Sequence, residues 1–192
     1  MEKRYYYLFG LIAFFFALLI DDKLAFFLAE NRTEFLTVIF NALTKIGTYI
    51  VIPFLLISIF FWRTKNKRLI VPLWISLLVS LAIIYLLKFS IQKPRPEQAL
   101  GLNSAIKESG YSFPSAHATA SFASLPVLNT ILSKLSWFWY LLAVLVAFSR
   151  IYLGVHYLSD VIAGAFIGYA VADYINSNQG RRLIRKINFL ER

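Results

Sequence analysis

Long runs of apolar residues dominate this chain and limit what it can fold into. Six runs approach the roughly 17–25 residues that a helix needs to cross the hydrocarbon core of a bilayer. These runs are Tyr5–Ile20, Ile46–Trp62, Leu69–Lys88, Ser115–Leu132, Trp137–Leu153 and Leu158–Tyr174. The sequence therefore predicts an all-α, polytopic membrane protein with six transmembrane helices, folded as a single domain over residues 1–192.

The chain carries an excess of positive charge, with 20 Lys and Arg residues against 10 Asp and Glu residues and a formal net charge of +10. In a soluble domain such an excess would suggest nucleic acid as a partner. Here the basic residues flank the apolar runs, which favours contact with anionic lipid headgroups and a role in topology. We therefore expect a lipid bilayer, and no nucleic acid, as the partner. The absence of cysteine excludes disulfides, zinc–thiolate sites and cysteine nucleophiles.

The basic residues also predict an orientation. Six spans would place the N-terminus, the 63–68 loop, the 133–136 turn and the C-terminal tail on one side of the membrane. The basic residues of that side are Lys3, Arg4, Arg63, Lys65, Lys67, Arg68, Lys134, Arg181, Arg182, Arg185, Lys186 and Arg192. Loops rich in Lys and Arg stay on the cytoplasmic side, so both termini are predicted to be cytoplasmic in a cell (inner) membrane. Because Asp21-Asp22-Lys23 follows the first run without a small-residue cleavage site, we expect an uncleaved anchor rather than a signal peptide.

The other side of the membrane carries two longer connections. Asp21–Lys45 contains Leu24, Phe27 and Leu28 among charged residues, a pattern typical of a helix lying in the membrane interface. We therefore expect an extracytoplasmic interfacial helical segment between the first and second spans. Phe89–Pro114 is polar and contains several prolines and glycines, so it is predicted to be an ordered loop.

Three short polar segments lie at the outer ends of the predicted spans. They are Lys88-Phe-Ser-Ile-Gln-Lys-Pro-Arg95-Pro96, Phe113-Pro114-Ser115-Ala116-His117 and Ser149-Arg150-Ile-Tyr-Leu-Gly-Val-His156-Tyr-Leu-Ser-Asp160. In the six-span topology all three reach the same outer surface, although they are distant in the sequence. We therefore expect their polar side chains to converge in one layer.

Lys88, Arg95 and Arg150 bring three cations to a similar depth. A charge costs about 2.5–3.5 kcal/mol at mid-membrane on insertion scales and less toward the interface. An anionic ligand would relieve the mutual repulsion of the three cations, and a phosphate group fits the planar fork of arginine. Ser115 stands just ahead of an apolar run, as an N-cap residue would, so the free N–H groups of the following turn would face the same anion.

The two histidines of the chain, His117 and His156, both belong to these segments. His156 and Asp160 are four residues apart, which predicts that they share one face of a helix. The carboxylate could then accept a hydrogen bond from the N–H of one imidazole nitrogen and leave the other nitrogen free to attack as a nucleophile. His117, in the first turn of its helix, is placed to act as general acid and later as general base. Because arginine, lysine and amide dipoles can stabilise the phosphoryl charge, we expect neither a metal nor another cofactor.

In order, Lys-x6-Arg-Pro, Pro-Ser-x-His and Ser-Arg-x5-His-x3-Asp resemble the three-part signature of the type-2 phosphatidic acid phosphatase superfamily. This family includes bacterial lipid phosphatases, phosphatidylglycerophosphate phosphatase, undecaprenyl-diphosphate phosphatases and the soluble vanadium haloperoxidases. The resemblance covers Lys88–Asp160 by motif and the whole chain by its six-span layout. It implies that His156 is the nucleophile, Asp160 its partner and His117 the acid. It also implies that the phosphate is bound by Lys88, Arg95, Ser115 and Arg150.

Some residues near these motifs have simpler interpretations. The family's usual Pro-Ser-Gly-His is Pro-Ser-Ala-His here, and Ala116 is tolerated if the position is helical rather than one of positive φ. Lys93 and Lys107 are expected to be solvated loop charges, and Ser149 a small packing residue.

The sequence thus predicts a lipid phosphatase, a phosphoric monoester or diphosphate hydrolase, that acts at the extracytoplasmic face through a phosphohistidine intermediate. Its substrate would be a membrane lipid such as a prenyl (undecaprenyl-type) diphosphate, phosphatidylglycerophosphate or phosphatidate, and no obligate protein partner is evident. Two alternatives stay open: a transporter or channel for phosphate-like anions, and a catalytically silent lipid-binding protein. The charges lie at one face rather than at paired broken helices in mid-membrane, which argues against the first. The presence of both histidines argues against the second.

Overall fold

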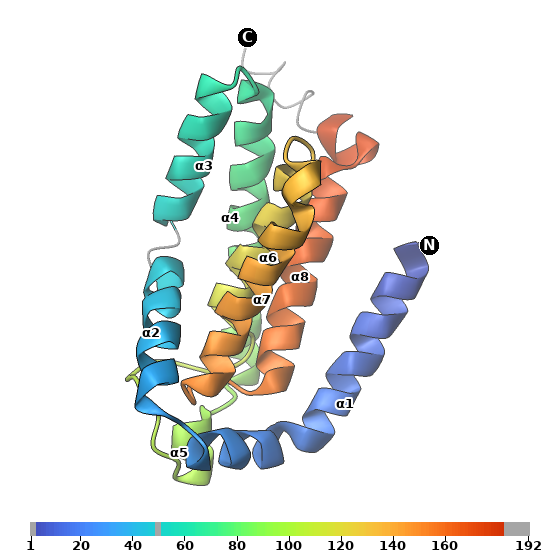
Figure 1. Cartoon of the computed structure of the whole chain (residues 1–192). Coiled ribbons are helices and arrows are strands. Elements are labelled where there is room, and N and C mark those ends of the chain that lie inside the picture. Colours follow the sequence, from blue (N-terminus) through green and yellow to red (C-terminus); the bar gives the residue numbers. More distant parts are fainter. Residues whose placement is uncertain (1–2, 49–50, 183–192) are drawn as a thin grey trace.

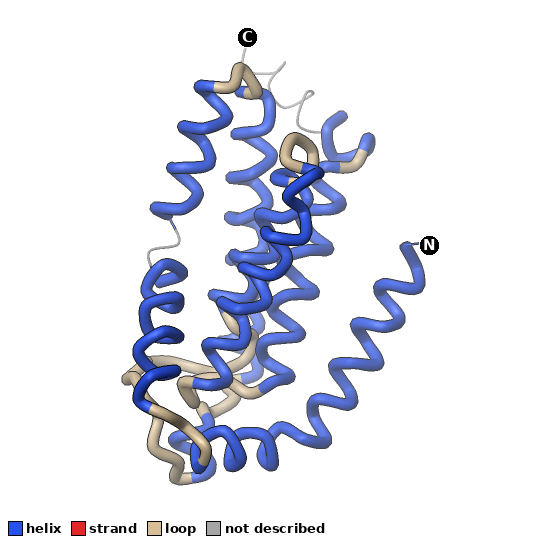
Figure 2. Tube along the Cα trace, viewed as in Figure 1, coloured by secondary structure: helices blue, strands red, loops and turns tan. Residues whose placement is uncertain are grey.

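The computed structural model describes residues 3–48 and 51–182, and this part of the chain contains helices and loops without a strand (Figure 2). The helices are α1 (Lys3–Glu30), α2 (Glu34–Thr48), α3 (Val51–Arg63), α4 (Ile70–Ile91), α5 (Pro96–Leu100), α6 (Ala116–Leu128), α7 (Ser136–Tyr152) and α8 (Leu158–Asn176). Short 3-10 turns, Lys67–Leu69 and Ser133–Leu135, precede α4 and α7. The all-α fold class predicted from the sequence is confirmed for these residues.

Helices α4, α6, α7 and α8 form the centre of the bundle, with α1 on one side and α2 and α3 on the other (Figure 1). α6 lies very close to α8 because Gly164 and Gly168 present no side chain to it. A Cβ at Gly164 would collide with the backbone of Ser115, and one at Gly168 with the backbone of Thr119. Small residues allow such close approach of membrane helices. The contact fixes the start of α6 against the start of α8.

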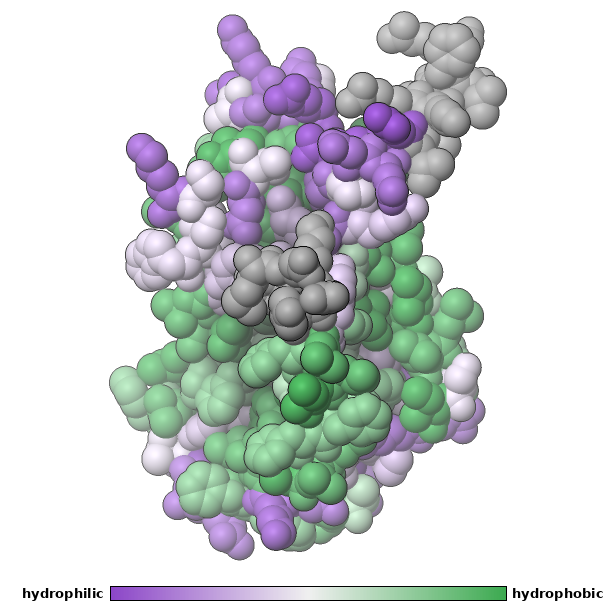
Figure 3. Space-filling model, turned by 90° about the vertical axis from the view of Figure 1, so that its right-hand side faces the viewer, coloured by the Kyte–Doolittle hydropathy of each residue, from purple (hydrophilic) through white to green (hydrophobic). Residues whose placement is uncertain are grey.

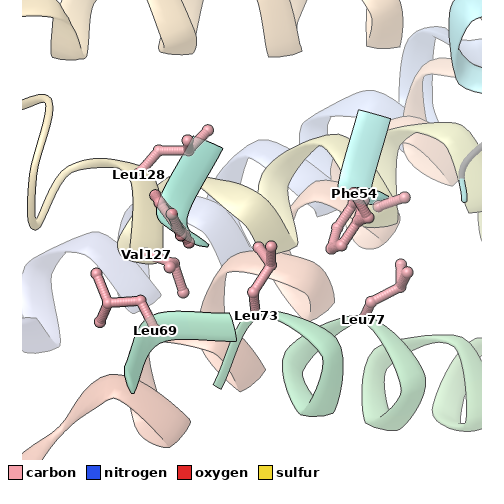
Figure 4. Packing of buried hydrophobic residues seen from close by; sticks show 8 residues of the cluster. Phe54, Leu69, Leu73, Leu77, Val127 and Leu128 are labelled. Atoms are coloured by element: carbon pink, nitrogen blue, oxygen red, sulfur yellow. The ribbon is translucent and has the colours of Figure 1, made fainter. Parts of the chain in front are cut away.

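Apolar side chains of α3, α4 and α6 pack together in the body of the bundle (Figure 4). Phe54, Leu73, Leu77 and Val127 are almost completely buried in this cluster. On the face shown in Figure 3, an apolar band lies between two polar ends. An apolar outer surface of this kind suits contact with lipid tails rather than water.

Three helical stretches of the described residues are long and apolar enough to cross a membrane, namely Lys67–Leu100, Ser133–Tyr152 and Leu158–Asn176. These stretches indicate a membrane protein. The predicted spans Ile46–Trp62 and Ser115–Leu132 correspond to shorter helices, because α3 and α6 have 13 residues each. At 1.5 Å per residue such a helix is about 20 Å long, against a hydrocarbon core of about 30 Å. Residues 49–50 of the second predicted span lie outside the described residues.

Helix α1 is longer than the predicted first span, since it continues beyond Ile20 to Glu30. Figure 1 shows its N-terminal part beside the bundle and its C-terminal part turning across the lower end of the bundle. After a short link, α2 runs along α7. The connection Asp21–Lys45, predicted as one interfacial segment, is therefore divided between the last third of α1 and most of α2.

Candidate active site

The three polar segments meet at one end of the bundle. There α4 and α7 end and α6 and α8 begin, so each segment lies at the end of a packed helix (Figure 1). The convergence expected from the motif positions is thus a feature of the fold, and contacts between individual side chains join the segments.

His156 and Asp160 form the centre of this region. His156 Nδ1 lies 3.5 Å from Asp160 Oδ2, and both side chains are almost completely buried. The two residues do not share one face of a helix as predicted, because His156 precedes α8, whose N-cap is Tyr157. Asp160 instead belongs to the first turn, where its Oδ2 accepts the backbone N–H of Tyr157 at 2.9 Å. Helix capping therefore positions the carboxylate beside the imidazole.

Ser112 is a third member of this group that the sequence reasoning missed. Its hydroxyl donates to Asp160 Oδ2 and lies 3.4 Å from His156 Nδ1. Its backbone carbonyl accepts from Lys88 Nζ at 3.2 Å, and Lys88 also donates to the carbonyl of Tyr111 at 2.7 Å. Lys88 thus holds the loop that supplies Ser112. The only signal in the sequence was the position of Ser112 next to the Phe113-Pro114-Ser115 motif.

Arg95 is fixed on the opposite side of the imidazole. Its guanidinium donates to the carbonyl oxygens of Val155 at 2.7 Å, Ser109 at 3.0 Å and Gly110 at 3.0 Å. The Nη1 atom of Arg95, which donates to Val155, also lies 3.4 Å from His156 Nε2. One ring nitrogen of His156 therefore faces a carboxylate and the other faces a cation.

Arg150 is completely buried and has the anionic partner that its position requires. Its Nη2 pairs with Glu108 Oε2, and its Nη1 donates to Thr44 Oγ1 at 3.0 Å. The other oxygen of Glu108 lies 4.0 Å from Arg95 Nη2. Glu108 thus bridges the two arginines predicted to bind phosphate. Glu108 was not predicted from the sequence, although an arginine within an apolar stretch, as Arg150 is, was a signal that an anionic partner lies elsewhere in the chain.

Ser115 and His117 come from the start of α6. Ser115 is the N-cap, as predicted, but its side chain makes no capping hydrogen bond, and among the described residues its buried Oγ has no hydrogen-bond partner. Its backbone N–H donates to the carbonyl of Asp160 at 3.0 Å. His117 is also buried and bonds the backbone of Thr44. Ala116 is the first residue of α6, so the position is helical and tolerates alanine as expected.

Two residues differ from their expected roles. Lys93 is not a solvated charge, because its ammonium group contacts Asp160 at 3.0 Å and Asp21 at 3.1 Å. Ser149 does more than fill space, since its buried hydroxyl lies 2.8 Å from Thr44 Oγ1. Lys107 is exposed, in agreement with its predicted role.

Burial and neighbouring charges shift the pKa values of His156 and Glu108, two loop residues of the site. Desolvation lowers the pKa of His156 to about 4, an effect that Asp160 opposes and that Arg150 and Arg95 reinforce. His156 is therefore a neutral imidazole near pH 7. Burial alone would raise the pKa of Glu108, but Arg150 and Arg95 outweigh it and hold this pKa below its ordinary value.

An apolar cavity of about 320 Å³ adjoins the polar region. His117 forms part of its wall, and the rest of the wall is mainly apolar, with side chains from α3, α6 and α7 such as Phe54, Leu125, Trp139 and Val146. The cavity therefore connects a buried imidazole with space suited to hydrocarbon.

The PAP2 superfamily profile matches residues 69–182, which include all three motifs and more than half of the chain. The chain belongs to the PAP2 superfamily. It is 33% identical over 132 residues to an undecaprenyl-diphosphatase from Sulfolobus acidocaldarius, covering 66% of this chain and 62% of that relative. It is 30% identical over 152 residues to phosphatidylglycerophosphatase B from Bacillus subtilis, covering 71% of this chain and 72% of that relative. Both of these relatives are phosphatases by name.

A solved structure supports the fold of this PAP2 member. The transmembrane PAP2-type phosphatidylglycerolphosphate phosphatase from Bacillus subtilis aligns with a TM-score of 0.71 at 24% identity and covers 94% of each chain. The described residues contain no group of three or more His, Cys, Asp or Glu side chains that could hold a metal ion. The cationic side chains of the site, two arginines and a lysine, and the N-terminus of α6 are suited to binding an anion.

Proposed function

We propose that this PAP2 protein hydrolyses a lipid phosphate monoester or diphosphate through a phosphohistidine on His156. The observation that carries the proposal is the environment of the His156 ring. Nδ1 faces Asp160 while Nε2 faces Arg95, so one nitrogen is held by an acceptor and the other is next to a group that attracts phosphate. This is the arrangement that a histidine nucleophile for a phosphoryl group needs.

The reaction follows from these positions. Nε2 of neutral His156 attacks phosphorus, a P–N bond forms, and the P–O bond to the lipid breaks. His117 donates its proton to the departing oxygen and then accepts one from the attacking water. Water breaks the P–N bond, inorganic phosphate leaves, and both histidines return to their starting states. Asp160 accepts a hydrogen bond from Nδ1–H throughout and stabilises the imidazolium character of phosphohistidine.

Lys88, Arg95, Ser115 and Arg150 would bind the phosphoryl oxygens. Two observations support this assignment within the described residues: Ser115 Oγ and Arg150 Nε are buried and have no hydrogen-bond partner. Polar atoms in that condition are costly unless a ligand satisfies them. The N-terminal N–H groups of α6 add a further attraction for an anion. Glu108 occupies one edge of Arg150, so the phosphate would have to share or displace that contact.

The substrate would be a lipid whose head enters the polar end while its tail stays in apolar surroundings. The apolar cavity beside His117 supports this. The names of the relatives favour a prenyl diphosphate of the undecaprenyl type or phosphatidylglycerophosphate, with phosphatidate as a further candidate.

For the membrane, we propose six spans in a cell membrane, with both termini cytoplasmic and the active site extracytoplasmic. The apolar band and the polar ends of Figure 3 fit a bilayer-embedded body. The basic residues Arg63, Lys65 and Arg68 lie at the bundle end opposite the candidate site, as the positive-inside rule requires. Arg185, Lys186 and Arg192, three of the basic tail residues from which this orientation was predicted, lie outside the described residues.

A trapping experiment tests the reaction. Purified protein is mixed with lipid bearing radiolabelled phosphate, quenched in alkali, and assayed for label on the protein, because phosphohistidine survives alkali and is lost in acid. We expect acid-labile label on the wild type, none on H156A, and accumulated label on H117A when the lipid carries a good leaving group. Phosphate release in EDTA should equal that in magnesium. A wild type that binds lipid but neither takes up label nor releases phosphate would favour a transporter or a binding protein.

A further inference from the structure

Lys93 lies at the centre of a second group of polar side chains behind the candidate nucleophile. Its Nζ contacts Asp160 Oδ1 at 3.0 Å, Asp21 Oδ2 at 3.1 Å and Ser159 Oγ at 2.9 Å, so all three of its protons have acceptors. The Tyr157 ring centre lies 4.0 Å from the same nitrogen. The Lys93 side chain is only 24% exposed, which is low for a loop lysine.

The two oxygens of Asp160 therefore have different partners. Oδ1 contacts Lys93, whereas Oδ2 accepts from Ser112 and from the backbone N–H of Tyr157 and faces His156. Rotation of the carboxylate would break contacts on both sides. Lys93 is thus the side chain that holds Oδ1 of Asp160, and together with Ser112 and the Tyr157 N–H on Oδ2 it fixes the orientation of the carboxylate plane toward the imidazole.

Asp21 fixes Lys93 from a distant part of the chain. This residue of α1 is buried, and its carboxylate accepts both the backbone N–H of Ser159, at 2.9 Å, and the Ser159 hydroxyl. Asp21 is thereby held against the first turn of α8, and Lys93 is clamped between two carboxylates. The charged or titratable groups that face one another here are Asp21, Lys93, Asp160, His156 and Tyr157, with Arg95 on the far side of the His156 ring.

We propose that Lys93, clamped by Asp21, is a positioning residue for the His156–Asp160 pair: it orients Asp160 and keeps its negative charge available when His156 becomes a phosphorylated cation. The inference rests on the proposed function of His156. Lys93 does not touch the phosphate in this scheme; it acts through Asp160. Without Lys93, the charge of Asp21 would stand uncompensated near Asp160, and the two carboxylates would repel.

A purely structural role makes a different prediction. If Lys93 only fastened α1 and the 92–95 loop to α8, its loss would lower thermal stability and leave the turnover of the folded enzyme unchanged. If it positions Asp160, its loss must lower kcat in protein that is still folded. The neighbouring carboxylate allows a sharper test, because removing the charge of Asp21 should partly repair the loss of Lys93.

The experiment compares K93M, K93R, D21N and K93M/D21N with two matched controls, K107M on the same long loop and D22N next to Asp21, both at exposed positions. For K93M we expect kcat to fall about 10- to 100-fold, as for other groups that orient a catalytic side chain, with KM changed less than about 3-fold. K93R should recover most of kcat. K93M/D21N should be about 5-fold or more faster than K93M. The controls should match the wild type.

The pH profile of kcat gives a second readout, since the acid limb of K93M should move to higher pH and return toward that of the wild type in K93M/D21N. A K93M enzyme with wild-type kcat and a lowered Tm would overturn the positioning role, as would a double variant no faster than K93M. The trapping assay separates this result from failure of the proposed function. If wild-type protein takes up no acid-labile label, the function fails; if K93M is labelled as fast as wild type, only the role of Lys93 fails.

Discussion

The polar end of the bundle and its apolar body are stabilised in different ways. In the body, side chains such as Leu73 and Phe54 are buried against other apolar groups and make non-directional contacts. At the polar end, Arg95, Arg150 and Asp160 are equally buried, but each is fixed by hydrogen bonds or ion pairs to atoms of other segments. Apolar packing tolerates substitutions that conserve volume. Removing one partner of a buried charge strongly destabilises the fold.

The difference has a consequence for function. The body can position the helix ends without supplying chemistry, and the close contact of α6 with α8 at Gly164 shows how it does so. In the proposed reaction the polar end supplies the reacting groups, and its loops give each group a defined orientation. We therefore expect mutations at the polar end to lower turnover. Mutations in the body should lower stability and leave turnover nearly unchanged.

The largest expected effect is at His156. Replacing it by alanine removes the proposed nucleophile, and we expect phosphate release to fall at least about 10⁴-fold, in the range seen when a covalent nucleophile is deleted. The measurement is release of inorganic phosphate from detergent-solubilised lipid by protein whose elution and Tm match those of the wild type. Substantial turnover by folded H156A would contradict the assignment of the nucleophile.

Arg150 should come next. A lysine at this position cannot keep both the contact with Glu108 and the contact with Thr44, because its single ammonium group lacks the fork of arginine. We expect R150K to lose about 10²- to 10³-fold in kcat/KM, as for loss of a transition-state hydrogen-bond donor. R181K, which changes a basic residue far from the site, is the control and should stay within about 2-fold of the wild type. Equal kcat/KM values for R150K and R181K would contradict a role of Arg150 in binding phosphate.

A substitution at Glu108 should strengthen anion binding, whereas the substitutions above weaken function. Its carboxylate pairs with Arg150, so an entering anion competes with it. We expect E108Q to bind vanadate about 10-fold more tightly than the wild type, because the amide keeps the shape of the side chain but not the charge that repels the anion. The Ki of vanadate measures this directly. Weaker vanadate binding in E108Q would mean that Glu108 orients the arginine for the ligand instead of competing with it.

The titration of His156 tests the burial of the site. Burial, opposed by Asp160, lowers its pKa to about 4 from an ordinary value of 6.5. The unfolded chain takes up this proton near pH 6.5 and the folded chain only near pH 4, so the free energy of unfolding should decrease as pH falls across that interval. Because the chain has two histidines, NMR of isotope-labelled histidine in H117Q follows His156 alone. A midpoint near 6.5 would indicate a solvated ring.

The smallest effect on turnover is expected in the body. Leu73 is completely buried between α4 and its neighbours, and L73A should lower the free energy of unfolding by about 2–3 kcal/mol through the cavity that it leaves. The kcat of the folded enzyme should change less than about 2-fold. Leu78, an exposed residue of the same helix, supplies the control L78A, which should alter neither quantity appreciably. A large loss of kcat in L73A would show that the two regions are coupled.

The sequence by itself determined the fold class and the place of the candidate site. Apolar runs of span length and polar motifs at their ends were enough to predict a helical membrane protein whose Lys88, Arg95, Ser115, Arg150 and the two histidines gather at one end. Hydropathy and motif spacing are local properties, and they fix where helices lie along the chain. They did not predict the helix lengths, because α1 continues past Ile20 and α6 ends at Leu128.

Only the tertiary structure decided which polar groups pair. Glu108 beside Arg150, Ser112 beside His156, and Lys93 between Asp160 and Asp21 join segments far apart in the sequence. A lysine in a loop has the same one-dimensional signature whether it is solvated, as Lys107 is, or clamped, as Lys93 is. The physical reason is that burial of a charge depends on what the rest of the fold places around it.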